Sequence, residues 1–399
     1  MSVLPSVILT DFCPVQISQP VPQEVYIDSL ARMMTKARLA DCPAASPDDV
    51  QAITAKVREN VERFAVSPQY IAARELNAFT APTTRSTPSG TPVFWAFPDI
   101  DKLPQGQPIN IRMTDNDRLS DEVFAKVYEH VTKPPDELVH VTSGGYSAPS
   151  PPQRFLAERG WGNTVVDHVY HMGCFGAFPA ARTASGALLT SYALEPNSPK
   201  KRADVIHAEY FSLHVDLGAQ EPEDIISFTL FGDGFIKYSA VPDSEYDQTC
   251  GGLRIMAMQD TILADSAGEM TWHLNTHQFT LHLAKTVPQH IRDNCLAFAR
   301  TLCAKAGIDF ETERHDMAYA IHTGGPKILD FVEEELGLDS TKLAHSRRLL
   351  LERGNMSSAA CPHIWDSIVR DETIAKGTKV LSIGFGPGLT VAGMIMEKV

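Results

Sequence analysis

The sequence predicts a layered α/β fold. Segments with the composition of buried strands alternate with segments whose apolar residues recur every three or four positions, as in amphipathic helices. The chain has 399 residues, of which 43% are hydrophobic, enough for two domains or for one large two-part unit. Because no repeat, low-complexity tract or flexible linker is visible, we expect the two parts to pack closely.

The N-terminal region is expected to be largely helical. Residues 22–41 and 46–66 space their apolar positions at three and four, and Ser46 is a suitable N-cap for the second segment. Residues 80–92 are rich in Pro, Thr and Ser and are expected to form a loop.

Beyond residue 135 the strands and helices alternate. Strands are expected at residues 136–145, 163–172, 202–214, 225–241, 252–263, 317–325 and 379–388. Helices are expected at residues 174–189 (despite Pro179), 287–307, 326–337, 346–354 and 357–371.

Composition excludes several classes of protein. The formal net charge is −14, whereas a nucleic-acid-binding protein normally carries a basic surface. The apolar N-terminus lacks a basic flank and is interrupted by Asp11, so we expect neither a signal peptide nor a membrane span. The seven cysteines are scattered without C-x-x-C spacing, which favours a reducing cytoplasm over a disulfide scaffold or a structural zinc site.

Cys174 is the first candidate for chemistry. It lies in YHMGCFGAFPAAR at an expected strand-to-helix junction, where the first N–H groups of the helix stabilise a thiolate. A free thiol with a pKa near about 8.5 is only slightly ionised at neutral pH, so a nucleophile also needs a basic neighbour. The alternative is a small apolar residue that fills the core.

Three other stretches contain candidates for a functional site. His322 ends an apolar strand before a Gly-Gly-Pro turn, and its alternative role is a structural histidine. Asn355 follows a glycine that ends a helix, and it could instead be an N-cap. The turn GFGPGLT at residues 384–390 either lines a cavity or is an ordinary loop.

Taken together, these stretches resemble the chalcone synthase-like, or type III polyketide synthase, family of the thiolase superfamily. The matching segments are GCF at 173–175, LFGDG at 230–234, HTGGPKILD at 322–330, GNMSSA at 354–359 and GFGPGLT at 384–390. The resemblance implies a five-layered αβαβα thiolase-type fold of two similar βα halves, here residues 1–245 with the cysteine and residues 246–399 with the histidine and asparagine. It also implies a homodimer.

The resemblance also implies catalytic roles. Cys174 would attack an acyl thioester and hold the acyl chain, and His322 would pair with the thiolate as an ion pair. His322 and Asn355 would then donate to the carbonyl of a malonyl unit as CO₂ leaves, and loss of one such donor typically costs ~3–4 kcal/mol. The resulting carbanion would condense with the Cys174 thioester. No metal or redox cofactor is expected, because the carboxylate lost as CO₂ supplies the driving force; acyl-CoA or acyl-carrier-protein thioesters are the expected substrates.

By the same resemblance, four residues would line the substrate pocket. Phe231 would be the gate between pocket and entry tunnel, Pro387 would shape the cavity floor, and Thr142 and Ser357 would line its wall.

The pocket also departs from the plant members of the family. Trp272 aligns with a glycine, Leu281 with a second gate phenylalanine and His214 with a cavity threonine. An indole in place of a glycine covers on the order of 150–200 Å² of pocket surface that would otherwise face open space. The pocket is therefore expected to be closed on the side where a polyketide folds, and few extensions are expected.

The residues that would recognise the acyl carrier have two alternative interpretations. The helix expected to bind coenzyme A phosphates carries Lys56, Arg58 and Arg63 interleaved with Glu59 and Glu62. Its alternative is a solvated face with charge pairs. A weak phosphate clamp fits an acyl carrier protein as partner, and the basic segment 200–202 could meet such an acidic partner or be a surface loop.

Three functions follow from this interpretation. The first is an acyltransferase that condenses an acyl thioester with malonyl units into an alkyl-pyrone or resorcinol-type product. The second is a ketosynthase that joins two β-ketoacyl chains into an α-pyrone, and an acyl carrier protein could deliver these chains. The third is a non-catalytic partner subunit of another synthase. A thiolase or hydroxymethylglutaryl-type synthase would need a second cysteine or a glutamate as base; Cys361 is the candidate for that role, and its alternative is a core thiol on a helix face.

Overall fold

The structure is a computed structural model that describes residues 4–80, 93–94, 100, 103 and 105–399. Most of the loop expected at residues 80–92 lies outside this described part. No helix of the described residues combines the length and apolar character needed to cross a membrane.

A nine-stranded mixed sheet forms the centre of the molecule, in the order β13-β14-β15-β10-β1-β9-β8-β6-β7. Its strands are β1 (Val7–Val15), β6 (Glu137–Thr142), β7 (Val165–Tyr170), β8 (Ala203–Glu209), β9 (Gly234–Pro242), β10 (Gly252–Ile262), β13 (Ala318–Ile321), β14 (Lys379–Gly386) and β15 (Thr390–Lys398). The short two-stranded sheets pair β2 (Val21–Pro22) with β3 (Ala73–Arg74), β4 (Phe79–Thr80) with β5 (Val93–Phe94), and β11 (Met270–Leu274) with β12 (Phe279–Leu283).

The nine strands form two halves, and four strands of each half share the same topology. In the first half β6 is parallel to β8, which is followed by antiparallel β9 and β1. In the second half β13 is parallel to β14, which is followed by antiparallel β15 and β10. β1 and β10 pair with each other and join the two halves, with Ile8 opposite Arg254.

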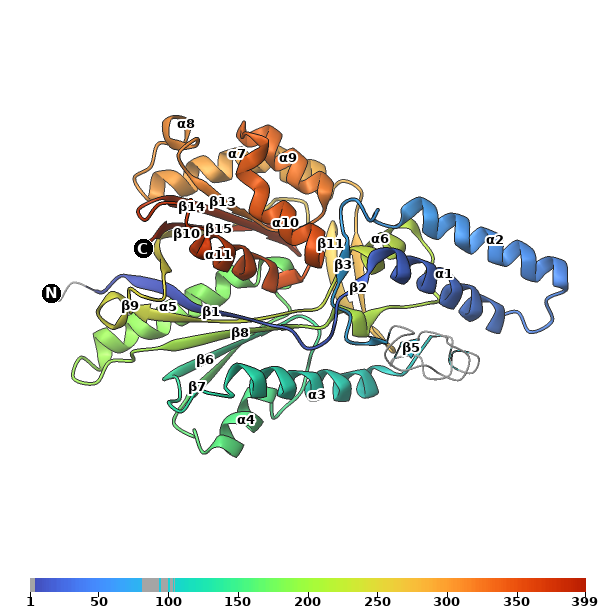
Figure 1. The fold of residues 1–399 in the computed structure, drawn as a ribbon, viewed down its shortest axis with the longest axis horizontal. Helices are drawn as coiled ribbons and strands as arrows, with labels where there is room; N and C mark the ends of the chain where they lie inside the picture. Colours follow the sequence, from blue (N-terminus) through green and yellow to red (C-terminus); the bar gives the residue numbers. More distant parts are fainter. Residues whose placement is uncertain (1–3, 81–92, 95–99, 101–102, 104) are drawn as a thin grey trace.

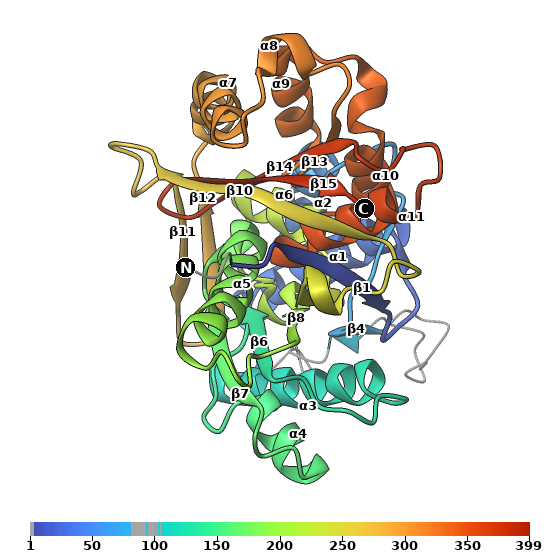
Figure 2. The same ribbon diagram turned by 90° about the vertical axis from the view of Figure 1, so that its left-hand side faces the viewer.

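Helices and sheet halves alternate as five layers. Figures 1 and 2 show α7, α8 and α9 above the upper half, α5 and α11 between the halves, and α3 and α4 below the lower half. The helices are α1 (Gln23–Ala40), α2 (Pro47–Phe64), α3 (Ile109–Val127), α4 (Pro151–Arg159), α5 (Ala177–Leu194), α6 (Pro222–Leu230), α7 (Val287–Lys305), α8 (Phe310–Glu313), α9 (Pro326–Leu336), α10 (Ala344–Arg353) and α11 (Ala360–Arg370). This arrangement confirms the αβαβα prediction.

The two central helices occupy equivalent places in their halves. α5 precedes β8 and α11 precedes β14, and both follow short 3₁₀ turns, Gly173–Phe175 and Ser357–Ala359. Pro179 is tolerated because it lies in the first turn of α5, where a backbone N–H has no partner within the helix. The symmetry therefore brings two turns, one from each half, to the middle of the molecule.

The N-terminal helices form a smaller unit beside the sheet (Figure 1). α1, α2 and α6 pack around a core that includes Tyr26, Leu30, Val57 and Ile225. As the sequence predicts, Ser46 caps α2, because its hydroxyl accepts the Asp49 N–H and the Asp49 carboxylate accepts the Ser46 N–H.

One predicted element was wrong. Residues 225–230 belong to helix α6 rather than to a strand, and only the following part of the segment is strand β9. Pro222 occupies the first turn of α6 and Glu221 with Asp224 forms a reciprocal cap, so the helix signal precedes the apolar run.

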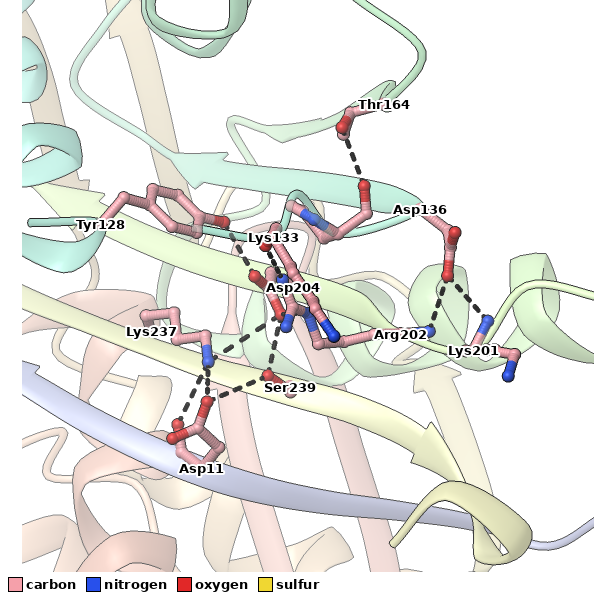
Figure 3. A network of polar contacts seen from close by, with 11 residues as sticks. Asp11, Tyr128, Lys133, Asp136, Thr164, Lys201, Arg202, Asp204, Lys237 and Ser239 are labelled. Atoms are coloured by element: carbon pink, nitrogen blue, oxygen red, sulfur yellow. Dashed lines mark hydrogen bonds and ion pairs between the residues drawn. The ribbon is translucent and has the colours of Figure 1, made fainter. Parts of the chain in front are cut away.

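The basic segment 200–202 is bound where strands β6 and β8 begin. Figure 3 shows the backbone N–H groups of Lys201 and Arg202 donating to Asp136, and the Arg202 side chain reaching Asp204 and the Lys133 carbonyl. Lys200 pairs with Glu137, and Lys201 lies 3.3 Å from Glu245. These charges are used within the chain, which disfavours the segment as a docking site.

Candidate active site

A cavity of about 920 Å³ contains the three residues singled out by sequence. Cys174, His322 and Asn355 come from three segments far apart in the chain, and all three line this cavity. The volume is in the range of small-molecule sites. The structure thus brings these three residues together around one cavity.

Glycines fix the position of Cys174. Gly173 has a φ of +66°, and a Cβ there would lie 2.6 Å from Cδ of Pro387. A Cβ at Gly386 would lie 2.4 Å from the Phe175 ring. The GFGPG turn therefore packs directly against the 3₁₀ turn that carries the cysteine, and the need for close approach explains its glycines.

Burial keeps the Cys174 thiol protonated. Cys174 is only 8% exposed to solvent, and it lines the cavity. Loss of solvation raises the pKa of the thiol to about 12, the Ser357 hydroxyl opposes this shift, and Glu209 adds to it. The free protein therefore holds a neutral thiol at Cys174.

His322 is also neutral in the free protein. Its backbone N–H donates to Ile383 at 2.9 Å, which continues the pairing of β13 with β14 and directs the residue beyond the strand end. Burial lowers the pKa of the imidazole to about 3. Among the described residues neither ring nitrogen has a hydrogen-bond partner. Burial thus favours a neutral pair over the ion pair expected from sequence.

Asn355 faces the cysteine with a fixed amide. Its Oδ1 accepts the Ser357 N–H at 2.9 Å, and its amide oxygen and nitrogen both lie 4.0 Å from the Cys174 sulfur. Its backbone pairs with that of Phe231 in an isolated parallel bridge. Because the oxygen is occupied, Nδ2–H remains available to a ligand beside the sulfur.

An aromatic wall closes the inner end of the cavity. The Phe211 ring stacks on Phe231 with 4.4 Å between ring centroids, and its centroid lies 5.2 Å from that of Trp272. The Trp272 ring in turn stacks on Phe279 with a centroid distance of 5.5 Å. The Trp272 indole N–H donates to the Ser143 carbonyl at 2.7 Å. Phe211, Phe231, Trp272 and Leu281 separate the main cavity from a void of only about 50 Å³ on their far side.

The remaining predicted pocket residues take different positions. Pro387 lines the main cavity, whereas His214 lines only the small void. His214 Nε2 lies 3.0 Å from the Gly144 carbonyl and Nδ1 accepts the Phe279 N–H, so both nitrogens are used. Thr142 and Ser357 are buried but are absent from the lining of either space.

The predicted phosphate-binding helix lies outside the cavity lining. Lys56 is paired with Glu59, and Arg58 lies within salt-bridge distance of Glu62 and Asp28. Arg63 packs over the ring of Phe64. Of this region only the segment after α2 reaches the cavity, through Ala65, Val66, Ser67 and Tyr70.

The sequence reading missed a buried carboxyl behind the cysteine. Glu209 ends β8, where it accepts the Ser143 N–H at 2.8 Å and a hydrogen bond from Ser358. Burial raises the pKa of Glu209 to about 7, and hydrogen bonds from Ser358 and Ser143 oppose the shift. An acidic residue near the end of the mostly apolar segment VIHAEYF was the signal that could have identified it.

The fold and site define a class of protein, the thiolase-type α/β proteins with a cysteine in a cavity between two similar halves. Among the solved structures that share this fold are two that match nearly the whole chain. They are the C-terminal type III polyketide synthase domain of Steely1, a type I/III hybrid from Dictyostelium, with a TM-score of 0.77, 21% identity and 99% of each chain covered, and PKS-I from the brown alga Ectocarpus siliculosus, with a TM-score of 0.78, 19% identity and 100% of each chain covered.

The sequence comparisons identify the family. Residues 254–399 match the family of chalcone and stilbene synthases, C-terminal domain. Type III polyketide synthase C of Arabidopsis thaliana is 32% identical over 266 residues, which are 65% of this chain and 66% of that protein. Type III polyketide synthase A of the same plant is 29% identical over 268 residues, 65% of each. The chain belongs to the type III polyketide synthase family, and it matches just under two thirds of the length of these two relatives.

Proposed function

We propose that this protein is a ketosynthase of the type III polyketide synthase kind, which condenses an acyl chain held on Cys174 with malonyl-derived units. The observation that carries the proposal is the shared cavity, in which the Cys174 sulfur lies 4.0 Å from the Asn355 amide and His322 lines the same space. No metal or other cofactor takes part in this proposal, and acyl and malonyl thioesters are the substrates.

In the loading step, the Cys174 sulfur attacks the carbonyl carbon of the acyl thioester. Neutral His322 accepts the thiol proton as the new C–S bond forms, and it returns this proton to the carrier thiolate that leaves. Burial keeps the His322 imidazole neutral before the reaction, and the neutral imidazole is the form that can accept a proton.

In the condensation step, the malonyl thioester loses CO₂ and the electrons of the broken C–C bond form an enolate. His322 and the Asn355 Nδ2–H donate hydrogen bonds to the enolate oxygen, which forms in a cavity where such donors are effective. The enolate carbon attacks the acyl carbonyl on Cys174, and the cysteine leaves as a thiolate that is reprotonated before the next cycle.

The aromatic wall supports a product with few extensions. Only about 50 Å³ is available beyond Phe231 and Trp272, whereas about 920 Å³ lies on the side of the cysteine. A growing chain therefore has little room to fold inward, and an acyl chain extends along the apolar lining of the larger space. An alkyl-pyrone or a resorcinol-type product fits these proportions.

The same proportions favour one alternative, a ketosynthase that joins two β-ketoacyl chains into an α-pyrone. Incubation with acyl, β-ketoacyl and malonyl thioesters, followed by mass spectrometry of the products, distinguishes the two. Masses that rise by malonyl-derived units support extension, and a single mass equal to two joined chains supports the alternative. If neither product forms and Cys174 carries no acyl group, the chain is the non-catalytic partner subunit of another synthase.

We further propose a cytoplasmic homodimer that accepts its acyl group from coenzyme A or from an acyl carrier protein. Light scattering of the purified protein tests the dimer, which predicts twice the chain mass of 43.8 kDa.

A further inference from the structure

Two lysines lie at the rim of the cavity that contains Cys174. Lys285 precedes α7 and Lys327 lies in the first turn of α9, and both line the cavity while their side chains are exposed to solvent. Within the described part of the chain, neither ammonium group has an ion-pair or hydrogen-bond partner. The rim therefore offers two positive charges that have no direct partner, on a protein whose net charge is −14.

The acidic residues of the same rim are already engaged. The Glu223 carboxylate lies 3.3 Å from His282, and Asp330 accepts a hydrogen bond from Arg347 at 2.8 Å. Glu221 caps the start of α6 through the Asp224 N–H. These contacts leave the two lysines as the rim charges that are free to meet a ligand.

The cations of α2 do not compete for this role. Lys56 and Arg58 are paired with acidic neighbours, Arg63 packs on Phe64, and none of the three lines the cavity. A charge that already has a partner must lose that contact before it binds an anion, whereas an unpaired lysine does not.

We propose that Lys285 and Lys327 bind the phosphate of the phosphopantetheine arm that delivers the acyl group to Cys174. The inference rests on the proposed function, because it assigns the carrier contact of the same site. Acyl-CoA and an acylated carrier protein both present this phosphate at the end of the arm remote from the thioester. A phosphate held at the rim leaves the arm to pass down the apolar cavity to the buried sulfur. The helix start beside Lys327 adds its positive end to the attraction.

The test is the rate of acyl loading on Cys174, followed by intact-protein mass spectrometry. Three donors carry the same acyl group: acyl-CoA, an acylated carrier protein, and the acyl N-acetylcysteamine thioester, which has no phosphate. The variants are Lys285→Glu, Lys327→Glu and their combination. Lys305→Glu is the matched control, because Lys305 is an exposed lysine at the far end of α7, ~27 Å along the helix from its start.

We expect each single variant to lower loading from a phosphate-bearing donor about tenfold, and the pair to lower it further, with a weaker dependence on salt. Loading from the N-acetylcysteamine thioester and loading of Lys305→Glu should match the wild type. The donor whose loading falls most identifies the source of the phosphate.

Two results would overturn the inference and are distinguishable from each other. If all three donors load the double variant at the wild-type rate, or if Arg58→Gln lowers loading while the rim variants do not, the lysines do not bind the carrier but the proposed function stands. If no donor loads the wild-type protein, the proposed function itself fails.

Discussion

The Asn355 amide is held in a fixed orientation with its nitrogen facing the Cys174 sulfur. Its oxygen accepts the Ser357 N–H at 2.9 Å, and the amide lies 4.0 Å from the sulfur. The amide can therefore donate to an oxyanion beside the acyl group without a change in its own orientation. The arrangement gives Asn355 the role of a hydrogen-bond donor to the oxyanion, whereas Cys174 has the role of the nucleophile.

We predict that Asn355→Ala loads acyl groups normally but condenses them about 10²–10³-fold more slowly, because one donor to the enolate is lost. Single-turnover loading and product formation are measured on the same sample. Equal loss of loading and condensation in a folded variant would instead mean that Asn355 positions the cysteine.

Alkylation of Cys174 should become faster with pH without a plateau below pH 9. Burial raises the pKa of this thiol to about 12, so the thiolate fraction increases about tenfold for each pH unit across the neutral range. Iodoacetamide labelling of Cys174, quantified by peptide mass spectrometry between pH 6 and 10, measures this profile. A plateau already present at pH 6 would instead show a resting thiolate–imidazolium pair.

Removal of the Trp272 side chain should connect the two spaces on either side of the aromatic wall. Trp272→Ala is expected to shift products towards additional malonyl units and to lower the free energy of unfolding by about 2 kcal/mol, since the side chain is half-buried. Trp272→Phe keeps most of the wall and serves as the control. An unchanged product distribution in Trp272→Ala would show that the wall does not limit extension.

Gly386→Ala should displace the turn that carries Cys174. The new Cβ would lie 2.4 Å from the Phe175 ring, so we expect a loss of about 1–3 kcal/mol in stability together with slower acyl loading. Gly162→Ala, where a Cβ meets nothing within 4 Å, is the control and should behave as the wild type. Thermal unfolding and the loading rate measure the two effects. Normal loading in Gly386→Ala would contradict this packing argument.

Stability should fall as the pH increases towards 7 because of Glu209. Its pKa is raised by burial to about 7, so the folded protein favours the protonated carboxyl, and this stabilisation is fully present below about pH 4.5 and lost as pH passes 7. The size is on the order of 3 kcal/mol. Glu209→Gln should unfold with a smaller difference between pH 5 and pH 8, as measured by denaturant titration. An identical pH dependence in both proteins would remove Glu209 as its source.

The strands and helices that carry the site were predictable because their patterns are strong. The apolar strand before His322, the helix after Cys174 and the glycine turn at 384–390 each have local signals that the structure confirms. Strands β1 and β15 were not predicted, since their pairing with distant strands, not their own pattern, makes them part of the sheet. Helix α6 was missed because its apolar run also suits a strand.

The details of the site depend on contacts that no local pattern contains. The stacking of Phe211 on Phe231, the burial that raises the pKa of Glu209, and the pairing of the α2 cations all follow from segments that meet only in the folded chain. The unpaired state of Lys327 likewise becomes visible only when its neighbours are known.

The capture of an acyl group by Cys174 is tested most directly by intact-protein mass spectrometry after incubation with an acyl thioester. We expect one added acyl mass on the wild type and on Cys361→Ala, which changes another buried thiol, and no added mass on Cys174→Ala. An acyl group that is retained by Cys174→Ala, or is absent from the wild type with every donor, would contradict it.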